Sequence, residues 1–457
     1  MTTQASTETG PATPPILELG DAFYDVVAPA DFPLAIPRFL NHRWAEQVGL
    51  GEVEWETHFA RFAPLPGNLP RPLALRYHGH QFRSYNPDLG DGRGFLFAQV
   101  RDVHGRLLDL GTKGSGQTPW SRQGDGRLTL KGGVREVLAT EMLEALGVNT
   151  SKSFALFETG EQLIRGDEPS PTRSAVLTRL SHGHIRIGTF QRLAFHEDTQ
   201  GMARLTRYCL AHLYGEEGDD PLRLFDLVCS ATAGLAASYV AAGFVHGVLN
   251  SDNINITGES FDYGPWRWAP DWDERFTAAY FDHMGLYAFG RQPEAIHWDV
   301  AQLGGCLSLI ADAPPLSDML ASWAARFEAA LVDRMLGRLG VARTDDAADR
   351  ALLTVLIAAL RTRTVGIDRL FFDWRGGRVP DGDNYRVPEF VALAAALAGR
   401  ERPPSHEYWA DDAPCGMPIE EVEEIWDAIA RSDDWLPFEA KIAAIRRMGE
   451  AMKADAA

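Results

Sequence analysis

The sequence predicts an α+β protein of two lobes, in which a smaller β-rich lobe is followed by a larger helical lobe. Short apolar runs separated by Gly-rich stretches fill residues 90–180, which is typical of strands. Long segments almost free of Gly and Pro follow from about residue 222, which is typical of helices. A chain of 457 residues with 45 % hydrophobic and 23 % charged side chains is also long enough to bury a large core.

The first half begins its regular structure with a predicted β-hairpin over residues 95–111. A polar His104-Gly105 turn separates the two apolar runs of this hairpin. A helix is predicted over residues 134–146, because the composition is helical and Gly147 can end it as a C-cap. Further strand candidates lie at residues 153–157, 162–164 and 175–180.

The second half is predicted to be mostly helical. Helix candidates cover residues 224–242, 318–339 and 350–362, and residues 244–264 read as a loop with short strands. The change of pattern divides the chain into a disordered tail at residues 1–15, a β-rich lobe with its N-terminal segment at 16–221, a helical lobe at 222–400 and a helical C-terminal extension at 401–457. We expect a ligand to bind in the cleft between the two lobes.

Composition excludes several classes of function. The chain has 63 acidic and 44 basic residues and a net charge of −19, so nucleic-acid phosphates would repel it and no nucleic-acid partner is expected. Its four cysteines form no CxxC pair, which argues against structural zinc and against a cross-linked secreted fold. No run of eighteen apolar residues and no signal-peptide pattern is present. A cytoplasmic protein without a membrane partner is therefore predicted.

One loop after the 224–242 helix has the spacing of a metal–phosphate site. His246 begins an eight-residue segment that ends at Asn253, and Asp262-Tyr263-Gly264 follows nine residues later. Protein kinases place His and Asn at the same two positions and continue with Asp-Phe-Gly. The Asn253 amide and the Asp262 carboxylate supply the oxygen ligands that a hard cation bound to phosphates prefers.

A lysine and an acidic partner extend this pattern into the first half. Lys113 shares one face of an extended segment with Asp109 and Gly111, so it can point toward a phosphate as a kinase strand lysine does. Glu136 and Glu141 of the following helix both qualify as its partner, and periodicity alone does not select Glu136. The glycines of the preceding stretch, Gly90, Gly92 and Gly94, would let the backbone approach phosphates closely.

The loop departs from an ordinary kinase at its third position. A protein kinase keeps its catalytic aspartate there, whereas this chain has Val248, which cannot accept a proton. Asp252 stands beside the metal-binding asparagine and is a candidate displaced base. Ordinary kinase chemistry is therefore in doubt.

These motifs together resemble the SelO family, the pseudokinase-like protein adenylyltransferases that are also called YdiU proteins. The resemblance covers residues 17–310 and is carried by the segments 108–120, 125–126, 177–179, 184–186 and 246–264. It implies a protein-kinase-like fold in which ATP lies reversed, so that AMP passes to Ser, Thr or Tyr hydroxyls of a protein and pyrophosphate leaves. ATP as substrate, Mg²⁺ as cofactor with Mn²⁺ as the alternative, and protein acceptors are the implied ligands and partners.

The resemblance also implies roles for individual residues. Asp252 would be the proton acceptor, Asn253 and Asp262 would bind the metal, and Glu136 would pair with Lys113. The nucleotide would be bound by Gly90, Gly92, Arg93, Lys113, Asp125, Gly126, Arg179 and Arg186. Physical chemistry favours the two arginines at positions 179 and 186, because guanidinium groups can grip a terminal phosphate and stabilise leaving pyrophosphate.

The chain differs from many family members at its C-terminal end. Those members carry a selenocysteine or cysteine close to the C-terminus, whereas the last cysteine here is Cys415. Redox control through a terminal thiol is therefore not expected, and the C-terminal helices have no assigned role. Two other functions stay open, a phosphotransferase that binds ATP in the usual direction and a non-catalytic nucleotide-binding regulator. The protein targets, the choice of ATP or UTP and the oligomeric state have no readable motif.

Overall fold

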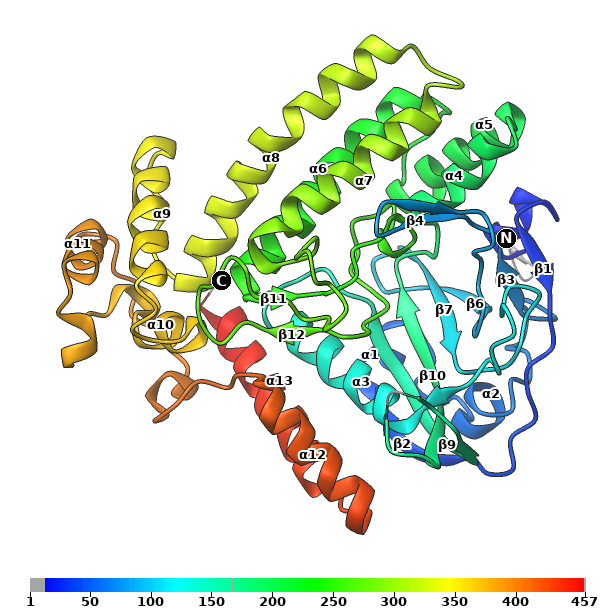
Figure 1. Ribbon diagram of the computed structural model, residues 1–457, viewed down its shortest axis with the longest axis horizontal. Coiled ribbons are helices and arrows are strands. Elements are labelled where there is room, and N and C mark those ends of the chain that lie inside the picture. The colour runs from blue at the N-terminus through cyan, green and yellow to red at the C-terminus, as the bar shows by residue number, and fades with distance from the viewer. Residues whose placement is uncertain (1–12, 167, 456–457) are drawn as a thin grey trace, which may run out of the picture.

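The computed structural model describes residues 13–166 and 168–455, so most of the predicted tail at residues 1–15 lies outside the described residues. An antiparallel sheet with the strand order β1-β3-β6-β7-β10-β9-β2 dominates the first half, and β8 pairs with β10 (Figure 1). The eight strands are β1 (Tyr24–Val26), β2 (Ile36–Leu40), β3 (Leu73–Leu75), β6 (Leu96–Arg101), β7 (Leu107–Lys113), β8 (Leu128–Thr129), β9 (Lys152–Leu163) and β10 (Thr172–Ser181).

The predicted hairpin is confirmed as β6 and β7. Its turn is held by Asp102, whose Oδ1 accepts hydrogen bonds from the backbone N–H groups of His104 and Arg106, both at 2.9 Å. Gly105 adopts φ +80°, a backbone conformation that favours glycine. The side chain of one aspartate and the glycine at the turn thus explain why the chain reverses here.

Two of the predicted strands are in fact one. The separate strands predicted at residues 153–157 and 162–164 are wrong, because β9 runs through both of them. Its pairing with β10 jumps from Glu158 to Gln162, and Gly160 adopts φ +80° inside this bulge. A glycine that reads as a turn in the sequence here bends a continuous strand.

The predicted helix of the first half is α3 (Leu130–Ala145), which begins four residues earlier than expected. Thr129 caps it, because the Thr129 side chain accepts a hydrogen bond from the backbone N–H of Gly132 at 3.1 Å. The predicted end is confirmed, and Gly147 follows with φ +77°. Smaller helices of this half are α1 (His42–Gln47) and α2 (Trp55–Phe59).

Long helices form the second half, as the sequence predicts (Figure 1). They are α6 (Pro221–Ala242), α7 (Gln292–Leu307), α8 (Ala313–Leu339), α9 (Asp346–Arg361) and α11 (Pro388–Leu397), and the shorter α10 (Ile367–Asp373) lies between α9 and α11 in the sequence. By length and composition α6 is apolar enough to cross a membrane, but 72 % of its most apolar 18-residue window is buried. Its packing against α7 and α8 accounts for this apolar character.

The change from strands to helices occurs before the predicted boundary at residue 222. Helices α4 (Ile187–Phe195) and α5 (Thr199–Tyr208) precede it, and they pack against α7 and α6, respectively. The described chain therefore has a β-rich first part and a helical second part, consistent with two lobes. The position of the domain boundary stays a prediction.

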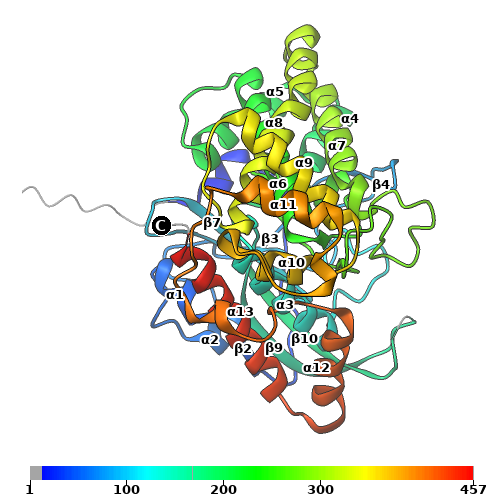
Figure 2. The same cartoon turned by 90° about the vertical axis from the view of Figure 1, so that its left-hand side faces the viewer.

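The C-terminal helices return to the first half of the chain. Helix α13 (Leu436–Ala454) follows α12 (Ile419–Ser432), and both views place α13 beside α3 (Figures 1 and 2). Buried apolar residues of α3, α6 and α13 belong to one continuous core. The C-terminal extension is thus part of the framework that supports the sheet and its helix.

The remaining elements are short. Two small strand pairs are β4 (Gly79–Gln81) with β5 (Ser84–Asn86) and β11 (Phe244–Val245) with β12 (Arg267–Trp268). Single helical turns are η1 (Pro15–Leu19), η2 (Cys209–Tyr214), η3 (Ser251–Asn253), η4 (Phe289–Arg291), η5 (Arg375–Gly377), η6 (Asp383–Tyr385) and η7 (Glu407–Ala410).

Candidate active site

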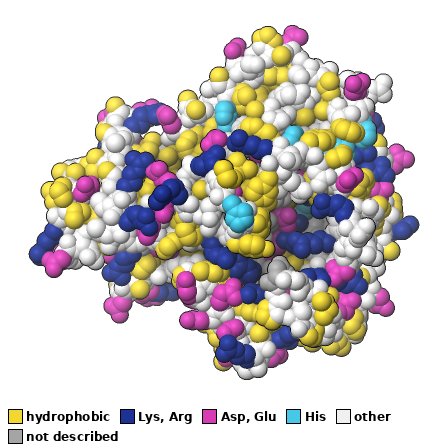
Figure 3. Space-filling model, in the orientation of Figure 1, with side chains coloured by type: hydrophobic (Ala, Val, Ile, Leu, Met, Phe, Trp, Pro, Cys, Tyr) yellow, Lys and Arg dark blue, Asp and Glu magenta, His cyan; other side chains and the backbone are white. Residues whose placement is uncertain are grey.

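A cavity of about 740 Å³ lies between the sheet and the loop that follows α6. Lys and Arg side chains edge a hollow on this face of the molecule (Figure 3). Of the twelve residues predicted for the site, all except Glu136 line the cavity: Gly90, Gly92, Arg93, Lys113, Asp125, Gly126, Arg179, Arg186, Asp252, Asn253 and Asp262. The fold therefore gathers side chains that are separated by as many as 172 positions, from Gly90 to Asp262.

A buried lysine at the end of β7 is the centre of an ion-pair network. The Lys113 ammonium lies 2.5 Å from Oε2 of Glu136 and 2.8 Å from Oδ1 of Asp262. The Arg179 guanidinium contacts the same two carboxylates, at 3.3 and 3.4 Å. Glu136 is thus the acidic partner of Lys113, the choice that periodicity had left open. Glu141 points elsewhere on α3 and pairs with Arg446 of α13.

Asp262 is held in a strained conformation within this network. Its φ of +62° is uncommon for a residue with a side chain and is a feature found at functional sites. Burial alone would raise the pKa of the Asp262 carboxyl, but Lys113, Arg179 and Arg93 hold that pKa well below its usual value. Asp262 is therefore an ionised carboxylate at neutral pH.

Arg186 lies at the N-terminal end of α4 and is buried. Its guanidinium lies 4.1 Å from the Tyr77 ring centroid and 5.0 Å from that of Phe261, so two aromatic rings flank it. Nη1 donates to the backbone oxygen of Asp252 at 3.2 Å, and Nη2 lies 3.5 Å from Oδ1 of Asp91. Among the described residues, the Nε atoms of Arg186 and Arg179 have no hydrogen-bond partner. Each arginine therefore has one buried N–H group that no described residue binds, and both side chains line the cavity.

The carboxylate of Asp252 lies unpaired in the turn η3. Oδ1 is buried and finds no hydrogen-bond donor within the described parts of the chain. Burial raises the pKa of Asp252 to about 6, and the nearby Arg186 opposes this rise. The neighbouring Asn253 donates from its amide nitrogen to the backbone oxygen of Val248 at 3.0 Å. A carboxylate with such a pKa at the edge of the cavity is suited to accept a proton.

His246 connects this loop to the segment of Asp262. Its Nε2 lies 3.0 Å from the backbone oxygen of Phe261, and its backbone N–H donates to the side chain of Gln292 at 2.9 Å. Burial lowers the pKa of His246, so the neutral ring donates this bond. His246 thus fixes the distance between the two chain segments that carry the candidate metal ligands.

The Gly-rich stretch packs closely against protein and also lines the cavity. A Cβ atom on Gly90 would lie 2.4 Å from the Trp120 ring, and one on Gly92 would lie 2.9 Å from the Trp120 backbone oxygen. A Cβ on Gly94 would overlap the backbone oxygen of Thr112 at 2.0 Å. Close packing in the described structure therefore already requires glycine at these positions, independently of any ligand.

Replacing Gly90 with alanine is expected to destabilise the fold by about 1–3 kcal/mol and to weaken nucleotide binding, because Trp120 must move. The control is Gly305→Ala in α7, where an added Cβ meets no atom within 4 Å. That control is expected to be neutral or stabilising by up to about 1 kcal/mol. Urea unfolding of both variants measures the difference, and equal stabilities would contradict the packing explanation.

Three of the predicted residues lie at the rim of the cavity. Arg93 is exposed, and half-exposed Asp125 forms an ion pair with Arg165 at 2.8 Å. Gly126 adopts φ +70° and packs against the backbone of Gly116. The sequence interpretation missed Tyr77, Asp91, Trp120 and Arg165, which also line the cavity. Of these, only Asp91 carried a signal, because it stands inside the Gly-rich stretch.

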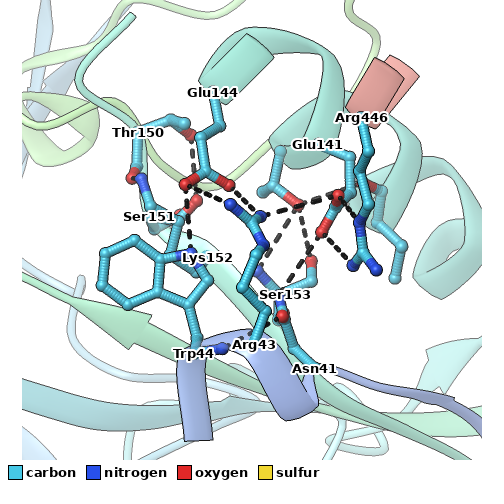
Figure 4. Close-up of polar contacts among 12 residues, drawn as sticks. Asn41, Arg43, Trp44, Glu141, Glu144, Thr150, Ser151, Lys152, Ser153 and Arg446 are labelled. Atoms are coloured by element: carbon cyan, nitrogen blue, oxygen red, sulfur yellow. Dashed lines mark hydrogen bonds and ion pairs between the residues drawn. The ribbon is translucent and has the colours of Figure 1, made fainter. Parts of the chain in front are cut away.

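A polar network behind the site fixes α3, the helix that carries Glu136 (Figure 4). Buried Glu141 accepts from Nε of Arg446 at 2.8 Å and from its Nη2 at 3.1 Å. One turn further on, Glu144 accepts from Arg43 at 2.5 Å and from the Trp44 indole at 3.1 Å. Residues from α1 and α13 therefore hold the far side of α3 while its near side faces Lys113.

The α+β fold and its cationic cavity define a protein suited to bind a polyphosphate ligand, and comparisons with known proteins give its class. The sequence matches the family described as "Protein adenylyltransferase SelO" over residues 9–384. The chain belongs to the SelO family and is a nucleotidyltransferase.

Relatives align over nearly their whole length. A protein named "Protein nucleotidyltransferase YdiU" from Gloeobacter violaceus is 42 % identical over 95 % of this chain and 94 % of its own. Proteins of the same name from Synechococcus elongatus and Synechocystis are 41 % and 40 % identical. The alignment with the Synechococcus elongatus protein covers 96 % of this chain and 96 % of that protein. The alignment with the Synechocystis protein covers 93 % of this chain and 95 % of that protein.

Proposed function

We propose that this chain transfers AMP from ATP to Ser, Thr or Tyr hydroxyls of proteins and releases pyrophosphate. One observation carries the proposal: the unpaired carboxylate of Asp252 shares a cavity with Lys113, Arg179 and Arg186, while the kinase position for a base is Val248. The description of the family and the printed name of the relatives, protein nucleotidyltransferase, support a protein acceptor.

The chain's own residues divide the work of the reaction. Lys113, Arg179 and Arg186 bind the triphosphate, and their positive charge stabilises the negative charge that develops on the leaving pyrophosphate. The acceptor oxygen attacks the α-phosphorus, the bond from that phosphorus to the pyrophosphate oxygen breaks, and the hydroxyl proton passes to the Asp252 carboxylate. This order of events requires ATP to lie reversed within a kinase-like fold, which is part of the proposal.

The residues present fit a divalent metal ion. Asp262 is ionised, and the amide oxygen of Asn253 accepts no hydrogen bond from the described residues. Within residues 13–166 and 168–455, no three His, Cys, Asp or Glu side chains form a metal site alone. Mg²⁺ typically takes one or two protein oxygens and completes its shell with phosphate and water. Asn253 and Asp262 would hold Mg²⁺ or Mn²⁺, and the bound ion would neutralise part of the negative charge of the phosphates.

The direct test uses ATP labelled at either the α- or the γ-phosphate, with magnesium and protein acceptors. We expect α-label, and no γ-label, to become covalently attached to protein. Transfer of γ-label alone would replace this proposal with a phosphotransferase. Measurable ATP binding without transfer of either label would favour a nucleotide-binding regulator. Competition by unlabelled UTP in the same assay measures the preference for the base.

A further inference from the structure

A two-residue turn beside the cavity holds large side chains in a conformation that favours glycine. Strands β4 and β5 pair Gln81 with Ser84, so Phe82 and Arg83 alone form the turn between them. Their φ angles are +49° and +63°. Turns of this kind normally use Asn-Gly or Gly-Gly. Strain of this type is retained where the surrounding structure demands it, often at functional sites.

This hairpin rests directly on the loop that carries Asp252. The backbone N–H of His80 donates to Ser251 Oγ at 2.7 Å, and that of Phe82 donates to Asn250 Oδ1 at 3.0 Å. A Cβ on Gly79 would lie 2.9 Å from the Asp252 side chain. The turn therefore stands at the end of the cavity where the acceptor hydroxyl must arrive.

Exposed apolar side chains extend from this turn. The Phe82 ring lies 5.9 Å from Phe281, which in turn lies 5.1 Å from Tyr280. Phe82 and Phe281 are 37 % and 41 % exposed, and Tyr280 and Met284 are 82 % and 85 % exposed. We call these four residues, Phe82, Tyr280, Phe281 and Met284, the apolar ledge. Hydrophobic side chains gather beside the hollow on this face, over the segment between α6 and α7 (Figure 3).

Two arginines, Arg83 and Arg291, stand at the rim of the ledge, in a chain whose net charge is −19. Glu294 lies 3.2 Å from Arg83 and 3.3 Å from Arg291, so two arginines share one carboxylate. Arg291 also donates to the backbone oxygen of Met284 at 3.3 Å, which ties the rim to the ledge. An apolar surface with two arginines at its rim can complement a polypeptide that carries apolar and acidic residues.

We propose that the apolar ledge binds the acceptor polypeptide, by holding a large apolar side chain a few residues from the acceptor hydroxyl while Arg83 and Arg291 face acidic residues beside it. The inference rests on the proposed function, because it names the substrate surface of the same site. The backbone N–H of Phe82 donates to the side chain of Asn250, two residues before Asp252. An extended segment advances about 3.3 Å per residue, so a hydroxyl at Asp252 and an apolar side chain at Phe82 would belong to nearby residues of one segment.

The test measures peptide binding separately from transfer. Each fluorescein-labelled peptide has a central Tyr, and Leu, Phe or Ser is placed at one flanking position at a time. The residues next to that position are either acidic or neutral. Binding to the full chain with Mg²⁺ and a non-hydrolysable ATP analogue is followed by fluorescence anisotropy. We expect peptides with Leu or Phe to bind about tenfold more tightly than the Ser versions, and acidic neighbours to strengthen binding in a salt-sensitive way.

Two variants and a control assign the effect to the ledge. The double variant Phe82→Ser/Phe281→Ser should remove the preference for apolar peptides. The Tyr280 side chain is almost fully exposed and so does not support the fold. The variant Tyr280→Ser should therefore weaken the preference while leaving the fold intact. Val391→Ser on α11 removes an exposed apolar side chain elsewhere and should leave the preference intact. Equal binding of Leu and Ser peptides to the unaltered chain, or a preference that survives both ledge variants, would overturn the proposal. Peptide binding without transfer of α-label would refute only the proposed reaction.

Discussion

Replacing Asp262 with alanine is expected to reduce AMP transfer by about a thousandfold, because one change removes a candidate metal ligand and the anion that orders two cations. Lys113 lies 2.8 Å and Arg179 lies 3.4 Å from the Asp262 carboxylate. Without the Asp262 carboxylate, we expect the Lys113 and Arg179 side chains to turn toward Glu136. Their positive charges would then no longer lie where the phosphates bind. Attachment of α-labelled AMP to protein, measured at saturating ATP, gives the result.

Two comparisons make this experiment specific. Asp262→Asn keeps the size of the side chain and removes its charge, so a loss of similar magnitude is expected. Asp271→Ala removes a carboxylate nine residues further along, whose partner is the half-exposed Arg363 at 2.8 Å, and should retain nearly full activity. Wild-type rates from Asp262→Ala, with the fold intact by circular dichroism, would refute the assignment of this residue.

Replacing Arg446 with methionine is expected to lower the free energy of unfolding by about 3 kcal/mol, because it leaves the buried Glu141 carboxylate without its closest cation. Methionine keeps an apolar side chain of similar length, so the effect reports the loss of the guanidinium group, which also lies 5.8 Å from the Phe39 ring centroid. Arg43 lies 3.8 Å from Glu141 and offers partial compensation. Urea unfolding followed by far-ultraviolet circular dichroism measures the loss.

The matched control is Arg431→Ala in α12. Arg431 pairs with Asp427 at 2.6 Å, but both side chains are exposed. Its removal should change stability by less than about 1 kcal/mol. Equal effects of the two substitutions would show that burial of Glu141 has no energetic consequence.

The sequence predicts the site better than it predicts the supporting structure. Asn253, Asp262 and Lys113 can be selected from the sequence because phosphate and metal chemistry restricts both residue type and local spacing, and the structure places all three at one cavity. Glu136 could not be chosen over Glu141, because α3 is buried on nearly all sides and its periodicity carries little information. The choice depends on Arg446, 305 positions after Glu141, and no local pattern contains such a contact.

Other features were missed because they break the usual rules. Gly160 reads as a turn, yet β9 passes through it with a bulge. Phe82 and Arg83 give no turn signal, although they form the tip of a hairpin. Gly90 lies too close to the Trp120 ring to carry a side chain, a contact that no local pattern contains. Tertiary packing decides each of these cases.

The link between α3 and α13 has a consequence for synthesis on the ribosome. At 5–20 residues per second, roughly 15 to 60 s separate the addition of Glu141 from that of Arg446. Once Asp262 has been added, the growing chain contains every strand of the large sheet and the predicted site residues, but it still lacks the Arg446 cation that pairs with Glu141. A nascent polypeptide of this kind therefore completes the support of α3 by α13 only late in translation.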